Sequence, residues 1–332
     1  MFFPVPDGYG QCVVSARMTG GLSATRHRDA TSKKKTGIDS TGMSNFRPVS
    51  NVSFMSKIIE RAVAIQLTKY LSTSDLLPCL HSAYRKRHST EMALLRVWSD
   101  ILEAADERVT VLAMLDLSSA FDCDDHTILL QRVQFCAGLT NSVLECISSF
   151  LSGWTQQIAY NGVLSSFQPA LFGVPQGSVL GPLLYAMYTA ELFPIVAQHQ
   201  FRLHMYANDS QVFVSAPAND ATTVVTRLSA CIADINDWMK ASRLRLNPSM
   251  TQVMWLGTSQ QLARDVPLLS TMVTVVDSAR NLGVIIDSQL CLDAHVAAVC
   301  RCGYGQLRKL RPVTKSHRDI GSGICIQSSG LL

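Results

Sequence analysis

Three polar residues at two places in the sequence have the side chains and surroundings needed to hold a divalent metal ion. Asp116 directly follows residues 109–115, a continuous apolar run with the length of a buried strand. Asn208 and Asp209 form the polar turn within residues 203–214, which read as strand, tight turn and strand. If the two segments are neighbours in one sheet, these side chains converge. Carboxylate and amide oxygens suit Mg²⁺, so the pattern predicts a magnesium site.

Two divalent ions held a few ångströms apart are what nucleotidyl transfer requires. One ion activates the attacking 3′-hydroxyl group, and the other stabilises the leaving pyrophosphate. Taken alone, Asp116 is equally well explained as a structural turn residue, and so is the pair of Asn208 and Asp209. The prediction therefore depends on the elements around them.

Two other groups of residues suggest chemistry but are better explained by structure. Asp124, Asp125 and His126 resemble a metal cluster, yet Asp125 stands directly before a helical segment and fits a helix N-cap. Ser178 and His126 could mimic a nucleophile and its base, but nothing in their spacing supports a hydrolase elbow. We expect a site at neither place.

Helices and strands alternate around the polar residues. Residues 55–71 form one predicted helix, and a second begins near Ser89 or Thr90, both favoured N-cap types. Residues 126–150 are helical in pattern, and residues 281–286 suggest a further strand or hairpin. The predicted buried faces are Ile58, Ile59, Ala62, Ile65 and Leu71 in the first helix, Leu95, Trp98, Ile101 and Leu102 in the second, and Val225, Leu228, Ile232, Ile235 and Trp238 in another.

Two segments are distinguished by basic residues. Residues 1–45 show no sustained period and carry Arg17, Arg26, Arg28 and three consecutive lysines against three aspartates, which predicts a weakly folded basic segment. Residues 85–88 read Arg-Lys-Arg-His at the start of a predicted helix, where anions are favoured. A solvated turn explains this run equally simply.

The composition describes a chain able to fold around a large core. Hydrophobic residues make up 47% and charged residues 16%, with a mean hydropathy of +0.17, which excludes a wholly disordered protein. The net charge of +4 suits a nucleic-acid partner without identifying one. Ten cysteines without a Cys-x-x-Cys pair indicate free thiols in a reducing compartment. The N-terminus lacks the pattern of a secretion signal, and residues 169–198 are too interrupted to span a membrane, so we expect an intracellular protein.

Several segments, in the right order, resemble the motifs of reverse transcriptases from non-LTR retrotransposons (LINE-like, of the jockey and CR1 type). Residues 115–122 read LDLSSAFD, residues 173–182 read GVPQGSVLGP, and residues 206–209 read YAND where the family has Tyr-Ala-Asp-Asp. The first motifs of the fingers resemble residues 46–50 and 82–90, and the last motifs of the palm resemble residues 244–251 and 279–285. The similarity covers about residues 33–313, nearly the whole chain.

The resemblance implies an α+β right-hand polymerase fold and RNA-directed DNA synthesis. Carried over position by position, it makes Asp116, Asn208 and Asp209 the catalytic set. Asp116 and Asp209 would be the side-chain ligands of a two-magnesium site, with the backbone of Leu117 near the second ion. The implied partners are an RNA template, a DNA primer and deoxynucleoside triphosphates, with neither a membrane nor an obligate protein partner.

The resemblance also implies which residues bind the nucleotide and the primer. Arg85 would contact the triphosphate, whose oxygens suit a bidentate guanidinium. Phe121 would lie under the sugar and exclude a 2′-hydroxyl group. Gln176 would pack beside the incoming base pair and the template, while Leu282 and Gly283 would support the primer end.

Three departures from the family pattern bear on activity. Asn208 replaces the first aspartate of the hairpin, so one negative charge is missing from the metal site. The attraction between two unit charges 4 Å apart is worth on the order of 4 kcal/mol at an effective dielectric near 20. If the transition state loses that stabilisation, the catalytic rate falls roughly a thousandfold. Met250 replaces the lysine of the family's Asn-Pro-Ser-Lys-Thr stretch, which removes general-acid assistance. After Val313 the resemblance fades and residues 315–332 show no helical period, so we expect the thumb to be mostly missing.

The sequence therefore predicts a flexible basic segment (residues 1–45), a reverse transcriptase domain with fingers and palm (residues 46–313), and a non-homologous or out-of-frame tail (residues 314–332). The predicted function is RNA-directed DNA polymerisation by a degenerate copy with a weakened two-magnesium site. One alternative is a catalytically inert nucleic-acid-binding remnant, favoured by Asn208 and Met250. Another is a metal-dependent nuclease built on Asp116, Asp122 and Asp209, which the block at residues 173–177 argues against.

Overall fold

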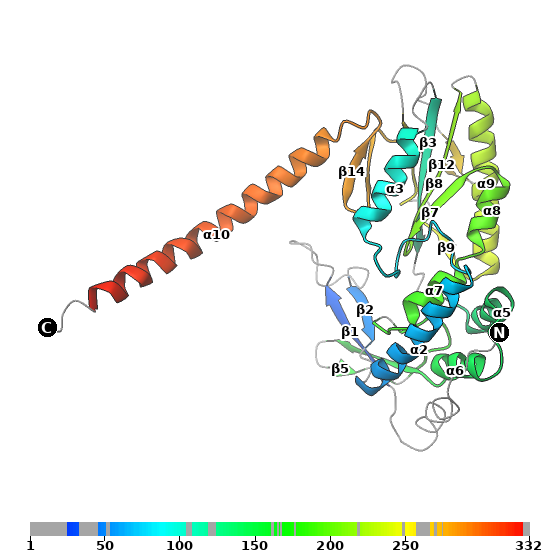
Figure 1. Ribbon diagram of the computed structural model, residues 1–332, viewed down its shortest axis with the longest axis horizontal. Coiled ribbons are helices and arrows are strands. Elements are labelled where there is room, and N and C mark those ends of the chain that lie inside the picture. Colours follow the sequence, from blue (N-terminus) through cyan, green and yellow to red (C-terminus); the bar gives the residue numbers. More distant parts are fainter. Residues whose placement is uncertain are drawn as a thin grey trace.

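An antiparallel sheet carries Asp116 and Asp209 and forms the centre of the larger part of the molecule (Figure 1). Its strands lie in the order β10-β3-β8-β7, and β9 pairs with the end of β3. The bounds are β3 Arg108–Ser118, β7 Arg202–Tyr206, β8 Asp209–Pro217, β9 Arg245–Leu246 and β10 Gln252–Leu256. The structure is a computed structural model that describes residues 25–32, 46–50, 54–103, 108–118, 124–160, 163–164, 166, 168–175, 177–217, 220–247, 250–256, 266–268, 271–273 and 275–327.

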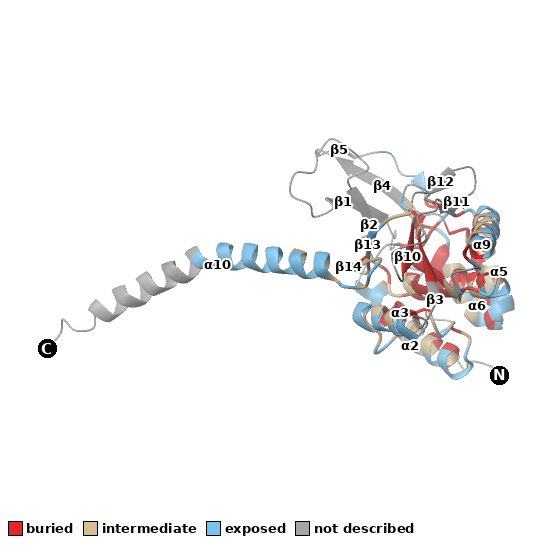
Figure 2. Cartoon of the chain, turned by 90° about the horizontal axis from the view of Figure 1, so that it is seen from above, coloured by how far each residue is buried: buried red, intermediate tan, exposed pale blue. Residues whose placement is uncertain are grey.

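Both faces of this sheet are covered, which explains the continuous apolar run that precedes Asp116. Side chains alternate along a strand, so Val111 and Leu115 face the larger core while Leu112 and Met114 face a second core. Figure 2 shows the central strands buried between the helices. Buried side chains of α5 His126–Ala137, α7 Gly181–Tyr188, α8 Leu192–Gln198 and α9 Ala221–Ala241 contribute to the larger core. The second core is formed with α3 Thr90–Glu103 and the hairpin of β13 Ser278–Asn281 and β14 Val284–Asp287.

The other half of the molecule holds α2, α6 and a second sheet. Its strand order is β2-β1-β4-β5, with β6 paired to β4, and β1 runs parallel to β4. The helices are α2 Phe54–Thr73 and α6 Asn141–Leu151, and the strands are β1 Thr25–Ser32, β2 Phe46–Ser50, β4 Thr155–Tyr160, β5 Val163–Leu164 and β6 Gln168–Pro169. A separate two-stranded hairpin is formed by β11 Val266–Leu268 and β12 Thr271–Val273.

The expectation of a weakly folded segment over residues 1–45 is wrong for β1, while residues 1–24 and 33–45 lie outside the described part. β1 is held by backbone pairing to β2 on one side and β4 on the other. Its sequence, TRHRDATS, has no apolar alternation. Pairing between distant segments can override a weak local pattern, which is why the sequence did not reveal this strand.

The buried faces predicted for α2 and α3 are partly wrong. Ile58 and Ile65 are 47% and 65% exposed, and Leu95 and Leu102 are 64% and 56% exposed. The buried side of α2 carries Glu60, Leu67 and Leu71, and that of α3 carries Ala93, Val97 and Ile101. Both helices carry apolar residues on more than one side. The helical spacing of apolar residues alone therefore does not determine which side packs against the sheet.

The last helix, α10 Asp293–Gln327, projects away from the rest of the molecule (Figure 1) and is exposed over residues 301–311 (Figure 2). The expectation that residues 315–332 lack a helix is wrong as far as Gln327. Once a helix has begun, each added residue gains a backbone hydrogen bond, so it can continue without an amphipathic period. No helix in the described part of the chain is long and apolar enough to cross a membrane.

Candidate active site

Asp116 and Asp209 lie directly opposite each other on β3 and β8. The side chain of Asp116 shares a face of β3 with Leu112 and Met114, while its neighbours Leu115 and Leu117 are buried on the other face. Opposed residues on antiparallel strands have Cβ atoms about 4.5–5.5 Å apart. The sheet therefore brings together the two carboxylates that are separate in the sequence, with Leu117 next along β3.

The turn between β7 and β8 differs by one residue from the predicted turn. Tyr206 pairs with Asp209, so the turn residues are Ala207 and Asn208, and Asp209 already belongs to β8. Ala207 has a φ of 58°, a left-handed conformation that residues other than glycine rarely adopt. The Asn208 Nδ2 group donates a long hydrogen bond of 3.5 Å to Asp116 Oδ1. The predicted catalytic set is therefore brought together, with an amide directed at one carboxylate.

Tyr84 and Tyr185 lie close enough to the aspartates to feel their charge. Backbone hydrogen bonds join the segment before Tyr84 to β7 of the hairpin, from Ser82 N to Met205 O at 2.9 Å. Burial, then Tyr206 and Asp209, raises the pKa of Tyr84. Burial, then the charge of Asp124, raises the pKa of Tyr185 well above its usual range, with smaller effects from Tyr84, Asp116 and Asp209. The sequence analysis assigned no role to these tyrosines, and the one signal was that Tyr84 precedes Arg85.

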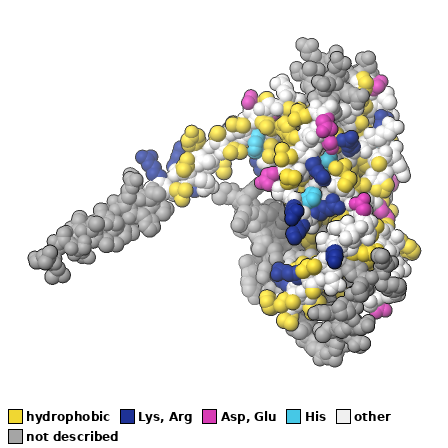
Figure 3. Space-filling view, viewed as in Figure 1, with side chains coloured by type: hydrophobic (Ala, Val, Ile, Leu, Met, Phe, Trp, Pro, Cys, Tyr) yellow, Lys and Arg dark blue, Asp and Glu magenta, His cyan; other side chains and the backbone are white. Residues whose placement is uncertain are grey.

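The Arg85 guanidinium binds backbone carbonyl groups in this structure. It donates hydrogen bonds to Leu77 O at 3.0 Å and Cys79 O at 3.4 Å and is half-buried. The next two residues, Lys86 and Arg87, are exposed. Figure 3 shows Lys and Arg side chains gathered on this face of the molecule, where the chain between α2 and α3 crosses it. The face offers positive charge beside the aspartate site.

The loop at residues 173–180 is held at its first end by the start of α5. Gly173 N donates to Asp124 O at 2.8 Å, and a hydrogen bond of 2.9 Å joins His126 Nε2 to Gly173 O. Asp125 caps α5 as predicted, because its carboxylate accepts from the amides of residues 127 and 128 at 2.9 and 3.1 Å. The two predicted nucleotide-binding residues Phe121 and Gln176 lie outside the described residues.

The remaining predicted positions lie on turns of this sheet and its neighbouring hairpin. Asn247 N donates to Asp116 O at 3.1 Å, and Met250, which is 61% exposed, donates its backbone amide to Asn247 O at 3.2 Å. Leu282 and Gly283 form the turn between β13 and β14, with φ values of 47° and 92°.

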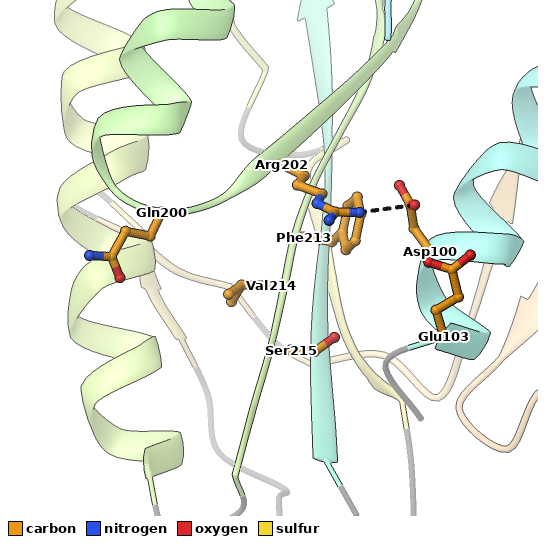
Figure 4. Close-up of a pocket in the computed structure, with 7 residues that line it drawn as sticks. All are labelled: Asp100, Glu103, Gln200, Arg202, Phe213, Val214 and Ser215. Carbon is orange, nitrogen blue, oxygen red and sulfur yellow. Dashed lines mark hydrogen bonds and ion pairs between the residues drawn. The ribbon is translucent and has the colours of Figure 1, made fainter. Parts of the chain in front are cut away.

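A cavity of about 320 Å³ lies away from the aspartates (Figure 4). Figure 4 shows Arg202 directed at Asp100, to which it is paired at 3.0 Å. Phe213 and Ser215 also line it, four and six residues along β8 from Asp209, roughly 13–20 Å at ~3.3 Å per residue. This cavity is therefore separate from the candidate active site.

The pairing of β3 and β8 brings the carboxylates of Asp116 and Asp209 together, and carboxylates are the side-chain ligands that Mg²⁺ takes in proteins. This ion takes one or two protein carboxylates and keeps several waters. Among the residues that the structure describes, no group of three or more His, Cys, Asp or Glu side chains is placed to hold a metal ion. The two carboxylates of Asp116 and Asp209 match in number what Mg²⁺ takes from a protein.

Comparisons with known proteins identify what this arrangement resembles. The sequence model of the family described as reverse transcriptase (RNA-dependent DNA polymerase) matches residues 32–286. The probable RNA-directed DNA polymerase from transposon BS of Drosophila melanogaster is 27% identical over 285 residues, which cover 83% of this chain and 31% of that protein. The RNA-directed DNA polymerase from mobile element jockey of the same species is 26% identical over 271 residues, which cover 80% of this chain and 29% of that protein. The chain thus spans less than a third of these relatives.

Two solved telomerase structures have a similar fold. Apo telomerase from Candida tropicalis, truncated from its C-terminal domain, matches with a TM-score of 0.54 and 13% identity over 86% of this chain and 58% of that one. Telomerase from Candida albicans, in complex with a TWJ fragment of telomeric RNA, matches with a TM-score of 0.51 and 12% identity over 81% and 46%. At such low identity the likeness concerns the fold alone.

Proposed function

The chain belongs to the reverse transcriptase (RNA-dependent DNA polymerase) family, and from this premise we propose that it is the catalytic part of an RNA-templated DNA polymerase whose metal site is weakened. The resemblance to reverse transcriptases of non-LTR retrotransposons is confirmed, and so is the right-hand polymerase fold. The observation that carries the proposal is the register of the sheet, which opposes Asp116 and Asp209 beside the turn residue Asn208.

Asp116 and Asp209 would hold two magnesium ions, with the backbone carbonyl of Leu117 near the second. When bound, such ions activate the 3′-hydroxyl group and stabilise the pyrophosphate. The side chains of this chain orient the reacting groups. Arg85 would release the carbonyls of Leu77 and Cys79 to meet the triphosphate, while Phe121 and Gln176 would contact the sugar and the base pair. The partners would be an RNA template, a DNA primer and deoxynucleoside triphosphates.

We infer that catalysis is impaired by two residues, Asn208 and Met250, each of which lowers the rate. Asn208 removes one negative charge from a site that must attract cations, and its amide donates toward Asp116 instead. Met250 is exposed, and its side chain carries no proton that it could donate to pyrophosphate. The second candidate function, binding of nucleic acid without catalysis, is favoured by the same two residues.

Primer extension separates these possibilities. We expect extension of a DNA primer on an RNA template to be near background for the natural chain. Extension should rise measurably in the Asn208→Asp variant and rise further when Met250→Lys is added. Asp116→Ala in the repaired chain is the control and should abolish extension. A repaired chain that binds primer-template but never extends it would contradict polymerisation and support the inert remnant, whereas cleavage without nucleotides would support a nuclease.

A further inference from the structure

Glu60 is a buried carboxylate that joins helix α2 to the loop at residues 173–180. It is 3% exposed, although charged side chains are rarely buried without hydrogen-bond partners. Its Oε2 atom accepts hydrogen bonds from Val179 N at 2.6 Å and Leu180 N at 3.2 Å. Its Oε1 atom accepts from Ser56 Oγ at 3.1 Å. The partners are separated by 119 and 120 positions in the sequence, which makes this a long-range connection.

The bonds of Glu60 add to the capping of α7 by binding the two amides that directly precede the helix. Helix α7 begins at Gly181, and its N-cap residue Leu180 provides no side-chain hydrogen bond. A carboxylate near a helix N-terminus is also favoured by the helix dipole. Hydrogen bonds to an ionised group are about twice as strong as neutral ones, so Glu60 holds this end of the loop firmly.

Hydrogen bonds hold the loop at both of its ends. Its first end is bonded to α5 through Gly173, as described above. At its second end Ser178 Oγ accepts from Gly181 N at 3.0 Å, and a Cβ atom at Gly181 would lie 2.6 Å from that oxygen. Gln176 stands between these two anchors. Glu60 therefore ties residues 179 and 180, which follow Gln176 in the sequence, to α2.

We propose that Glu60 is a positioning residue that fixes the loop of residues 173–180 relative to α2 and thereby sets the affinity for the incoming nucleotide. This inference rests on the proposed function, because it is in polymerisation that Gln176 meets the base pair. Loss of the Glu60 carboxylate should weaken nucleotide binding and leave the rate at saturating nucleotide within about twofold, since its hydrogen bonds go to Ser56, Val179 and Leu180. A residue that served folding alone would lower the active fraction, and hence the rate, without changing affinity.

The first measurement needs no activity. Amide hydrogen exchange over residues 177–183 is followed by mass spectrometry in the natural chain, Glu60→Gln, Glu60→Ala and the control Glu145→Gln, an exposed site on α6. The amides of Val179 and Leu180 should exchange at least about tenfold faster in Glu60→Ala, with Glu60→Gln between, because hydrogen bonds to charged groups are worth ~1.5–3 kcal/mol. Unchanged exchange in both Glu60 variants would overturn the proposal.

The second measurement uses the same variants in the chain carrying Asn208→Asp and Met250→Lys. The dissociation constant of a fluorescent deoxynucleoside triphosphate on primer-template, and the KM and kcat of extension, are determined together with melting temperatures. We expect the dissociation constant and KM to rise roughly tenfold in Glu60→Ala and less in Glu60→Gln, with kcat retained. A fall in kcat alone, or equal affinities, would overturn the role in nucleotide binding. Absence of both binding and extension in the parent would contradict the proposed function, and the exchange data would still report whether Glu60 holds the loop.

Discussion

At the scale of single residues, we expect Asn208 to change the electrostatics of the proposed site more than its shape. An aspartate at this turn would add a third negative charge beside Asp116 and Asp209, and like charges at such distances repel. The amide of Asn208 instead directs a donor at Asp116. The substitution therefore relieves repulsion in the metal-free protein while weakening its attraction for cations. We expect the natural chain to be at least as stable as the Asn208→Asp variant without magnesium.

His81 gives a prediction about pH. It is 1% exposed, and burial, followed by the positive charge of Arg85, lowers its pKa to about 4 from an ordinary 6.5. Above pH 6.5 the ring is neutral in both states, so its contribution to stability is fully present. As the pH falls toward 4, the unfolded chain takes up a proton that the folded chain resists. The free energy of unfolding should therefore fall by about 3 kcal/mol over this window.

Urea unfolding of the natural chain and His81→Gln at pH 7, 5.5 and 4 measures this effect. The variant should lose less stability than the natural chain between pH 7 and 4, by about 3 kcal/mol. His88→Gln, in the same segment but partly exposed, serves as the control. Parallel losses in the natural chain and His81→Gln would show that His81 is not the acid-sensitive group.

At the scale of elements, the hairpin of β13 and β14 is tied to the strand that carries Asp209. Gln211, two residues along β8 and on the same face as Asp209, donates to Asn281 Oδ1 at 2.9 Å, and both side chains are buried. Asn281→Ala should destabilise the protein by ~1–3 kcal/mol, because the Gln211 amide loses its buried acceptor. Thermal or urea unfolding measures the loss.

A double-mutant cycle with Gln211→Leu checks that this bond is the cause. If it is, Asn281→Ala should cost much less once Gln211 is already leucine, whereas independent effects would simply add. Asn236→Ala, at a partly exposed position on α9, is the control and should stay within about 0.5 kcal/mol. Strict additivity of the two substitutions would contradict the link between the hairpin and β8.

The sequence predicted buried faces correctly where an element carries only one apolar stripe. Leu228, Ile232 and Ile235 are buried on α9 as expected, because that helix has one dominant apolar stripe. Asp116 at a buried strand was also predictable, since a long apolar run requires cover on both faces. Glu60 could not be found in this way. A lone glutamate in a helix reads as a solvated residue, and its two backbone partners lie more than a hundred residues away.

At the scale of the whole molecule, binding to nucleic acid should be weak and strongly dependent on salt. The net charge is only +4, and the exposed basic residues Lys86 and Arg87 lie on the face beside the active site. Each phosphate contact on a duplex contributes a slope of about −0.9 to the log–log plot of affinity against salt. Fluorescence anisotropy of a labelled primer-template over a salt series gives this slope. A slope near zero at measurable affinity would contradict the prediction.

The same titration with Lys86→Gln and Arg87→Gln combined tests the location of the charge. If both side chains contact phosphate, the slope should become shallower by about 1.8. The affinity should fall by a similar factor for every template sequence, because phosphate contacts carry no sequence information. An unchanged slope would place the nucleic acid on another face.

The central claim is that Asp116, Asn208 and Asp209 together form the metal site of a polymerase and that Asn208 weakens it. Manganese binding, followed by the electron paramagnetic resonance of the free ion, tests this most directly. Natural chain, Asn208→Asp and Asp209→Asn are titrated under identical conditions. We predict that Asn208→Asp binds manganese at least about tenfold more tightly than the natural chain, and that Asp209→Asn binds more weakly still. Equal affinities in the natural chain and Asn208→Asp would contradict the claim and place the metal site elsewhere.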